Sequence, residues 1–472
     1  MDIVLVNPFP DYARGINETT FVPPLGPAYI ASYLREHGFS CAIVDAHVLQ
    51  MSESDILVEI QRLDPGVVGI SVNVISYQAA VRLSKLLKQE TATRTVIMGG
   101  PQVSALVGES LRNSAADAAI FGEGEETVLE IMERRRSQKP LFDDVRGVAF
   151  WRGEEVVINP PRERIRNLDQ LPFPAFDLLP NLTRYSHRVR RTPAMPIMTS
   201  RGCPYGCTFC SKSTFGRRVT FRSTQNVIQE IDYAVEKYHI KQLDVLDDAF
   251  ATKRQRALEI LTLLSQRSYP LAINFQNGIR ADSIDDELID LMKKASVFRI
   301  AFGIESGDEA ILRGIKKGTD VATIRRACTL AQKAGFIVDG FFMLGLPGDT
   351  EQTMQATIRL AKELPLNNAE FFITLPLPAT ELYDFVKGNG RLLVDARYGL
   401  STGFNVPVPA YEMDGLKKEE VIFYYKKAYR EFYFRPKKIM QFVLSIKSLE
   451  ELRWVVKTSI AVLKGLFVSR GN

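Results

Sequence analysis

The stretch that decides the fold of this chain is Arg201-Gly-Cys-Pro-Tyr-Gly-Cys-Thr-Phe-Cys210. It holds three of the five cysteines, Cys203, Cys207 and Cys210, in a C-x3-C-x2-C spacing. A short glycine-containing loop with thiolates at these offsets can wrap three corners of a metal centre. Structural zinc takes four protein ligands, and no further Cys or His pair lies close by. Three thiolates therefore favour a 4Fe–4S cluster with one open iron, while a zinc loop or buried cysteines remain the alternatives.

Short apolar strands alternate with helical patterns from Ala194 onward, and the cysteine loop follows the first of these strands. The expected strands are Ile197–Thr199, Gln242–Leu246, Ala272–Gln276, Phe298–Phe302, Gly340–Leu344 and Phe371–Leu375. Helical segments separate all of them. Six strands in this order predict a partial (β/α)6 TIM-type barrel, whose active site gathers at the carboxyl ends of the strands.

The first 136 residues show the same alternation, which predicts a doubly wound, Rossmann-like α/β domain with a parallel sheet. Glycines follow its strands at Gly26, at Gly99-Gly-Pro101 and at Gly122-Glu-Gly-Glu125. Tight turns between strand and helix also require glycine, so these positions alone do not prove a site. No G-x-G-x-x-G follows the first strand, which argues against a dinucleotide fingerprint.

Two further regions complete the expected organisation. Residues 137–193 are rich in proline and predict a hairpin around Gly153 followed by an extended linker. The barrel core is placed at 194–385 and a mainly helical C-terminal region at 386–472. Its last segment, Lys437–Phe467, has the pattern of a basic amphipathic helix, which either packs on the barrel or lies on an acidic membrane surface.

Bulk composition sets limits on function. The net charge is +5, and from Arg435 onward eight Lys/Arg face two Glu, so the body of the chain is near neutral. This balance argues against a nucleic-acid partner. The cysteines form no disulfide framework, and no signal peptide or apolar run of about 18 residues is present. We therefore expect a cytoplasmic protein, with peripheral membrane contact through the C-terminal helix as the alternative.

The cysteine loop, with Phe209 just before its last cysteine, resembles the signature of the radical S-adenosylmethionine (SAM) superfamily. Gly303-Ile-Glu-Ser-Gly307 and Gly345-Leu-Pro-Gly-Asp-Thr350 resemble loops of its cobalamin-linked group. The resemblance implies that the open iron chelates SAM, and that Phe209, Asp248, Arg280, Glu305 and Ser306 help to seat this cofactor. Helix N-capping remains the alternative role of Asp248 and a surface ion pair that of Arg280.

The first domain resembles the cobalamin-binding domain that precedes the radical SAM core in this group. The resemblance implies that loops after its strands hold cobalamin through Ser71, Gly99, Gly100, Pro101, Gly122, Glu123 and Gly124. Asp45-Ala-His47 begins like the D-x-H-x-x-G motif of cobalt-ligating histidines, but position 50 is Gln50. His47 is therefore interpreted as an ordinary loop residue.

These resemblances imply a cobalamin-dependent radical SAM enzyme. The favoured reaction is methylation of an unactivated carbon of a small-molecule or lipid-type substrate, by way of methylcobalamin and a 5′-deoxyadenosyl radical. Oxidative cyclisation or ring rearrangement is the alternative, and a non-catalytic Fe–S module is a weaker one. The expected cofactors are a 4Fe–4S cluster, SAM and cobalamin, and the expected partner is an external electron donor such as flavodoxin or ferredoxin.

Overall fold

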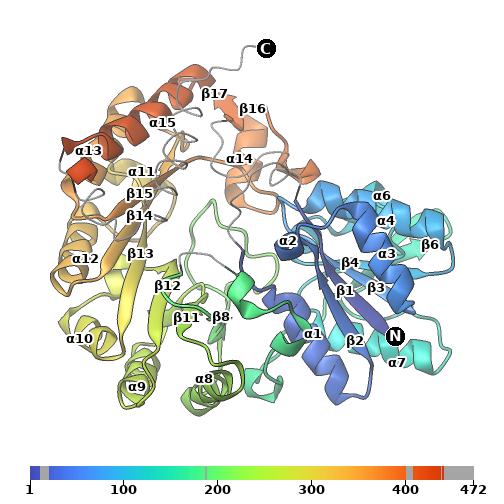
Figure 1. The fold of residues 1–472 in the computed structure, drawn as a ribbon. Coiled ribbons are helices and arrows are strands. Elements are labelled where there is room, and N and C mark those ends of the chain that lie inside the picture. Colours follow the sequence, from blue (N-terminus) through green and yellow to red (C-terminus); the bar gives the residue numbers. More distant parts are fainter. Residues whose placement is uncertain (11–20, 186–188, 400–407, 437, 441–472) are drawn as a thin grey trace.

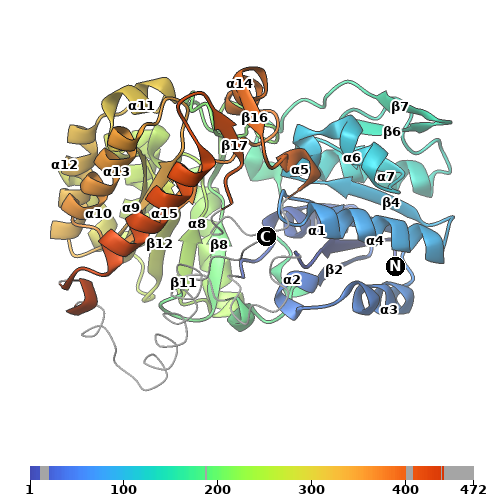
Figure 2. The same ribbon diagram turned by 90° about the horizontal axis from the view of Figure 1, so that it is seen from above.

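The computed structural model describes residues 1–10, 21–185, 189–399, 408–436 and 438–440. In this part of the chain two α/β lobes stand side by side with their strand ends turned toward each other (Figures 1 and 2). The fold class predicted from the sequence is confirmed. None of the described helices is long and apolar enough to cross a membrane.

The N-terminal lobe is built on a seven-stranded sheet with the order β2-β1-β3-β4-β5-β6-β7. Its first five strands are parallel, and the β6–β7 hairpin adds to β5 in antiparallel fashion. The strands are β1 (Ile3–Asn7), β2 (Cys41–Asp45), β3 (Val67–Ser71), β4 (Thr95–Gly99), β5 (Ala118–Ile120), β6 (Val148–Arg152) and β7 (Glu155–Ile158). The hairpin expected around Gly153 is therefore the edge of the first sheet.

Helices cover both faces of this sheet, because each parallel connection must cross over it. They are α1 (Leu25–Glu36), α2 (Ala46–Leu49), α3 (Glu53–Leu63), α4 (Tyr77–Glu90), α5 (Pro101–Ala105), α6 (Val107–Asn113) and α7 (Glu125–Arg136). The near-continuous Val and Ile content of the strands suits a sheet that is buried on both faces. One of its two apolar cores continues into the second lobe.

The second lobe is a six-stranded, all-parallel, partial barrel with the strand order β15-β14-β13-β12-β11-β8. Its strands are β8 (Ala194–Ile197), β11 (Gln242–Val245), β12 (Ala272–Ile279), β13 (Val297–Glu305), β14 (Ile337–Leu344) and β15 (Asn368–Ile373). The outer helices are α8 (Thr224–Tyr238), α9 (Arg254–Ser265), α10 (Asp286–Lys294), α11 (Glu309–Gly314), α12 (Val321–Lys333) and α13 (Glu351–Glu363). The first strand ends at Ile197, two residues before the predicted end, because the next residues turn toward the cysteine loop.

The C-terminal region joins the two lobes through α14 (Glu381–Asn389), the small hairpin of β16 (Gly390–Leu392) and β17 (Tyr411–Met413), and α15 (Lys418–Tyr433). The Leu382 amide donates to the Thr208 carbonyl of the cysteine loop at 3.0 Å. Gln102 of the N-terminal lobe donates through Nε2 to the Ala396 carbonyl at 2.8 Å. The same region therefore contacts the cysteine loop and the first lobe.

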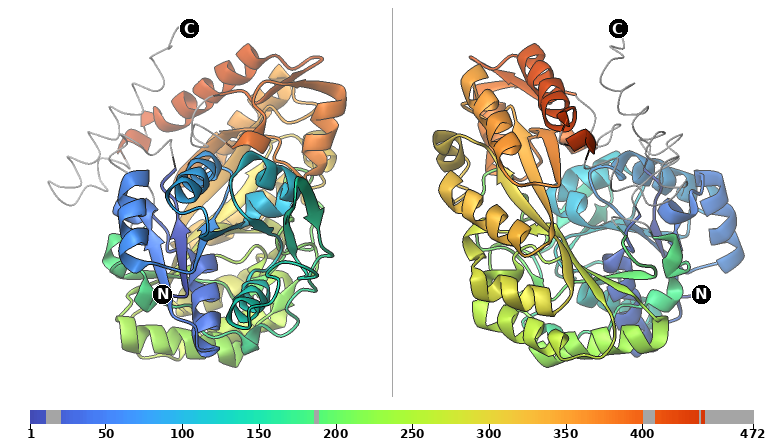
Figure 3. Two further views of the ribbon diagram at one scale, coloured as in Figure 1. Left: turned by 90° about the vertical axis from the view of Figure 1, so that its right-hand side faces the viewer. Right: turned by 60° about the vertical axis from the view of Figure 1, so that its left-hand side comes forward.

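Helix α15 covers the free edge of β15 (Figure 3). The Tyr433 hydroxyl lies 3.2 Å from the Ala369 amide nitrogen and 3.0 Å from the Ala369 carbonyl oxygen. The Tyr429 hydroxyl lies 3.3 Å from both backbone groups of Phe371. Two tyrosines thus occupy hydrogen-bonding positions that a seventh strand would fill. The amphipathic helix expected at Lys437–Phe467 falls almost wholly outside the described residues, and its membrane contact stays a prediction.

Candidate functional site

A small antiparallel ladder of β9 (Ser200–Arg201) and β10 (Thr220–Phe221) holds the two ends of the cysteine loop together. Gly202 follows β9 with φ of +95°, and a Cβ there would stand 2.5 Å from the Arg218 carbonyl oxygen. Only glycine fits this position, because an L side chain would be strained and would clash. The cysteines are therefore presented from a loop with a fixed base.

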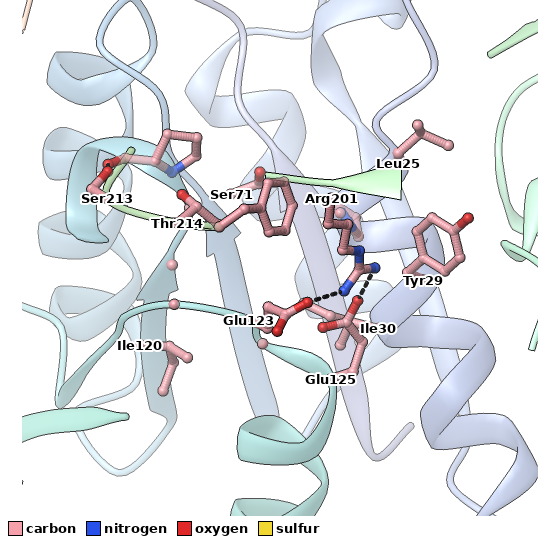
Figure 4. A pocket seen from close by; sticks show the side chains of 18 of the residues that line it. Leu25, Tyr29, Ile30, Ser71, Ile120, Glu123, Glu125, Arg201, Ser213 and Thr214 are labelled. Carbon is pink, nitrogen blue, oxygen red and sulfur yellow. Dashed lines mark hydrogen bonds and ion pairs between the residues drawn. The ribbon is translucent and has the colours of Figure 1, made fainter. Parts of the chain in front are cut away.

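A cavity of about 630 Å³ lies between the two lobes and is lined by residues of both. Figure 4 shows it from close by. The first lobe contributes, among others, all seven residues predicted to hold cobalamin: Ser71, Gly99, Gly100, Pro101, Gly122, Glu123 and Gly124. The second lobe contributes Cys203, Cys210, Asp248 and Asn277, together with the segment from Ser211 to Gly216. All seven predicted cobalamin residues thus face the same space as three of the predicted cluster and SAM residues, Cys203, Cys210 and Asp248.

The three loop cysteines are free thiols. Among the described residues, no group of three or more His, Cys, Asp or Glu side chains is placed to hold a metal ion. Burial raises the pKa of the Cys210 thiol to about 11, and the nearby Cys207 and Cys203 add to this shift. A thiol of this kind becomes a ligand when a cationic centre displaces its proton. Cys203 and Cys210 line the cavity, and Cys207 lies on the same loop outside the lining, a set that fits a cluster with one open iron.

The rim on the N-terminal lobe is made largely of backbone. Gly100 has φ of +118°, and a Cβ there would lie 2.5 Å from the Val72 carbonyl oxygen. A Cβ on Gly124 would stand 3.0 Å from Ile30. Glycine rims let a ligand approach the main chain closely. Such a surface fits the face of a large macrocycle such as the corrin of cobalamin.

Glu123 is the charged member of this rim, and its carboxylate is already engaged. Oε1 accepts from Arg201 Nη1 at 2.7 Å, and Oε2 accepts from the Ile165 amide at 2.8 Å. Arg201 also donates through Nη2 to Glu125 Oε1 at 2.6 Å (Figure 4). All three side chains are about 5% exposed. This Glu123–Arg201–Glu125 triad joins the floor of the first lobe to the base of the cysteine loop.

The barrel rim carries a second buried ion pair. Lys317 Nζ donates to Glu305 Oε1 at 2.7 Å, and both residues are buried. Glu305 has φ of +66°, which is unusual for a residue with a side chain and is typical of functional strain. A Cβ on Gly303 would lie 2.6 Å from Glu305 Oε1 and 2.9 Å from Lys317 Nζ, so this glycine provides the space for the pair.

The other predicted SAM-seating residues differ in their surroundings. Asp248 lines the cavity, and desolvation, with the neighbouring Asp247 charge second, raises its pKa. It does not cap α9, whose N-cap is Lys253, so the capping alternative is not observed. Ser306 is buried, with its Oγ accepting from the Asp308 amide and lying 3.3 Å from Thr357 Oγ1. Phe209 packs on the core.

Arg280 contacts Tyr205 of the cysteine loop and is not among the residues that line the cavity. Its guanidinium stacks on the Tyr205 ring at 3.7 Å, pairs with Asp282 at 2.7 Å and donates to the Lys317 and Gly318 carbonyls. Arg280 therefore makes an ion pair, but its side chain is only 13% exposed, so the pair is not a purely surface one. Its contact with SAM stays a prediction.

Sequence reasoning missed three residues of the site. Lys317 pairs with Glu305 from twelve positions away, and Arg201 and Glu125 belong to quoted motifs but were assigned no role. For Arg201 the available signal was its charge at the position before Gly202 and Cys203. Lys317 follows another lysine shortly after α11, and nothing in the sequence sets it apart.

His47 lies in the short helix α2 and not in a loop. Its ring contacts Phe9 and Phe21, and burial lowers its pKa to about 4. It does not line the cavity. Cys41 and Cys328, the two cysteines outside the loop, are buried.

Comparisons with known proteins agree with this geometry. The family model of the radical SAM superfamily matches residues 197–361, and that of the B12 binding domain matches residues 15–132. An uncharacterized methyltransferase of Pyrococcus horikoshii is 32% identical over 443 residues, covering 93% of this chain and 94% of its own length.

Two more distant relatives carry names that point to different reactions. Cytidylyl-2-hydroxyethylphosphonate methyltransferase of Streptomyces wedmorensis is 28% identical, over 76% of this chain and 77% of its own. An anaerobic magnesium-protoporphyrin IX monomethyl ester cyclase of Rubrivivax gelatinosus is 24% identical, over 94% and 79%. Among solved structures, the cobalamin-dependent SAM radical enzyme OxsB aligns with a TM-score of 0.77 at 17% identity, covering 99% of this chain and 72% of that one.

Proposed function

This chain belongs to the cobalamin-dependent radical SAM enzymes, and from that premise we propose that it transfers a methyl group to an unactivated carbon of a small-molecule or lipid-type substrate. One observation carries the proposal: the cysteine loop and the glycine rim of the first lobe line the same cavity. A substrate carbon held there would have access to both cofactors. The relatives named methyltransferases support the reaction type.

The cofactors would be held by residues that line the cavity and by further residues of the cysteine loop and the barrel rim. Cys203, Cys207 and Cys210 would bind the cluster, and the backbone of the glycine rim would bind cobalamin. When bound, the cluster with SAM supplies one-electron chemistry that removes hydrogen from carbon, and cobalamin supplies the methyl group. The Glu305–Lys317 pair offers one group of each sign, which suits the zwitterionic amino-acid part of SAM.

The chain itself contributes positioning and exclusion of water. The buried Glu123–Arg201–Glu125 triad fixes the first lobe against the base of the cysteine loop, so that the two walls of the cavity keep a set separation. Orientation of this kind matters because small displacements of reacting atoms cost large factors in rate. Asp248, whose pKa is raised by burial, is more readily protonated than an exposed aspartate and can share a hydrogen bond with a neutral ligand group.

Electrons must reach the cluster from outside the protein. The cysteines beyond the loop, Cys41 and Cys328, are buried singly in apolar cores and cannot build a second centre. An external one-electron donor such as flavodoxin or ferredoxin is therefore part of the proposal.

The test is anaerobic reconstitution of the full chain with iron, sulfide, SAM, cobalamin and a reductant, with candidate substrates supplied. 5′-Deoxyadenosine and S-adenosylhomocysteine together support the methyltransferase. Deoxyadenosine alone indicates the oxidative cyclase or ring-rearranging alternative. If neither product forms, the enzyme assignment is overturned.

The control variant is Cys207→Ala, which removes one cluster ligand. We expect its iron content to collapse and deoxyadenosine formation to fall by at least about a thousandfold, because the protein ligands hold the redox centre. Cys41→Ala, a cysteine outside the loop, should keep wild-type iron. A Cys207→Ala chain that still forms deoxyadenosine would refute the ligand assignment.

A further inference from the structure

The cysteine loop has two faces. Cys203 and the segment from Cys210 to Gly216 line the cavity, whereas the intervening residues from Pro204 to Phe209 do not. Pro204 is exposed and Tyr205 is partly exposed. A cluster held by the three thiols would therefore lie between the cavity on one side and the Pro204–Gly206 tip of the loop on the other.

Basic side chains surround this tip. A Cβ on Gly206 would stand 3.1 Å from Arg217 Nη2 and 3.9 Å from the Lys316 Cβ, so both residues flank the loop directly. Arg280 stacks on Tyr205 at 3.7 Å. Arg218 follows Arg217 and is likewise exposed. We call this set the collar: Tyr205, Arg217, Arg218, Arg280 and Lys316.

The collar keeps a positive balance after its own ion pairs are counted. Arg280 pairs with Asp282 at 2.7 Å, and Lys316 pairs with Glu381 at 2.5 Å. Arg217 and Arg218 have no ion pair within the described part of the chain. Four basic residues against two acidic ones leave a net charge of +2. This stands out because the body of the protein outside its C-terminal tail is close to neutral.

We infer that the collar is the docking surface of an acidic one-electron donor protein of the flavodoxin or ferredoxin class. The inference rests on the proposed function, since only a redox-active cluster needs such a partner. Tyrosine and arginine are the residue types that most often anchor protein interfaces. A positive patch also steers an acidic partner toward itself and raises the association rate.

The chemistry of the contact is a single electron transfer. The donor's reduced cofactor loses one electron and the cluster gains it, and no covalent bond forms or breaks. The collar surrounds the part of the cysteine loop that does not line the cavity. Docking there brings the donor against the residues that separate the cluster ligands.

The experiment measures cluster reduction in the reconstituted full chain by stopped-flow absorbance, with reduced flavodoxin, reduced ferredoxin or dithionite. The test variant is R217E/R218E. The matched control, K293E/K294E, makes the same charge change on exposed residues at the end of α10 that leads into β13, which is the opposite end of the barrel from the loop. Iron content verifies that each variant is loaded.

We expect the second-order rate with at least one protein donor to fall about tenfold or more in R217E/R218E at low salt, and the wild-type rate to fall as salt rises. Dithionite should reduce both variants and the wild type equally, and K293E/K294E should match the wild type with every donor. Two outcomes would overturn the collar inference alone. One is an equal reduction rate for R217E/R218E and K293E/K294E with the protein donors. The other is a wild-type cluster that dithionite reduces but that neither flavodoxin nor ferredoxin reduces. A wild-type cluster that dithionite cannot reduce would instead overturn the proposed function.

Discussion

The two walls of the cavity are built on different principles. The wall of the first lobe presents glycines and main chain, with Gly100 so close to Val72 that no side chain fits. The wall of the barrel presents thiols, Asp248 and, behind them, the buried Glu305–Lys317 pair. Both walls lie at the ends of parallel strands. The wall of the first lobe would select its ligand by shape, whereas the wall of the barrel would select its ligand by charge.

The difference corresponds to the ligands expected on each side. A large macrocycle gains most from a smooth surface that it can approach closely, because its binding energy comes from contact area. A small zwitterion needs fixed charges, which are strong only where water is excluded. Glu123 and Glu125, charged residues of the first lobe that line the cavity, both accept hydrogen bonds from Arg201 and so serve the connection between the walls.

A substitution in the glycine wall of the first lobe should give the largest effect on cofactor affinity. In Gly100→Ala the new Cβ meets the Val72 carbonyl and the backbone is strained, so the rim must move. We expect cobalamin affinity to fall by about a hundredfold, measured by spectroscopic titration, since displacing such a rim costs a few kcal/mol.

The matched change is Gly388→Ala in α14, where nothing lies within 4 Å and the backbone φ is ordinary. This variant should bind cobalamin like the wild type. Equal affinity of Gly100→Ala and wild type would show that the ligand does not need the close main-chain approach.

Breaking the charged wall should give a smaller effect on SAM. Lys317→Met leaves Glu305 buried without its cation, and we expect SAM affinity of the cluster-loaded protein to fall by about tenfold. The adjacent Lys316 pairs with Glu381 at an exposed position, so Lys316→Met should change affinity less than about twofold. If Lys317→Met and Lys316→Met lowered the SAM affinity equally in equilibrium binding, the buried pair would have no specific role.

The smallest expected effect concerns Asp244, a buried residue of β11. Burial raises the pKa of Asp244 to about 6, although Gln242 and Asn274 donate to its carboxylate. The folded state then binds this proton more tightly than the unfolded chain, so the contribution of Asp244 to stability is largest at low pH and is lost as the pH rises through about 6.

We expect Asp244 to contribute a loss of about 1 kcal/mol in unfolding free energy between about pH 4.5 and 6. Asp244→Asn should remove this part of the pH dependence in denaturation curves, whereas Asn at the exposed Asp290 should leave it intact. An unchanged profile in Asp244→Asn would mean that the carboxyl is not protonated in this range.

Much of this comparison was predictable because its signals are local. The C-x3-C-x2-C spacing, the glycines after strands and the alternation of strand and helix each reflect geometry within a few residues, and the structure places Ser71, Gly99, Gly122 and Cys203 on one cavity as expected. The partner of Glu305 could not be predicted, because Lys317 reaches it only after α11 has folded back.

Arg280 illustrates the same limit from the other side. Its position after a strand suggested the cavity rim, but its side chain stacks on Tyr205 and donates to two backbone carbonyls, and it does not line the cavity. The direction of a long side chain at a strand end depends on which neighbours offer acceptors, and those neighbours come from distant segments.

Tyr429 and Tyr433 of α15 affect how the barrel edge can pair with other copies of the chain. A six-stranded open barrel leaves β15 with a row of unpaired backbone groups, which in other proteins is a template for strand exchange and fibre growth. Tyr429 and Tyr433 satisfy Phe371 and Ala369 with side-chain hydroxyls that cannot propagate a ladder. The barrel can therefore stay incomplete, and open toward the first lobe, without offering its outer edge to another chain.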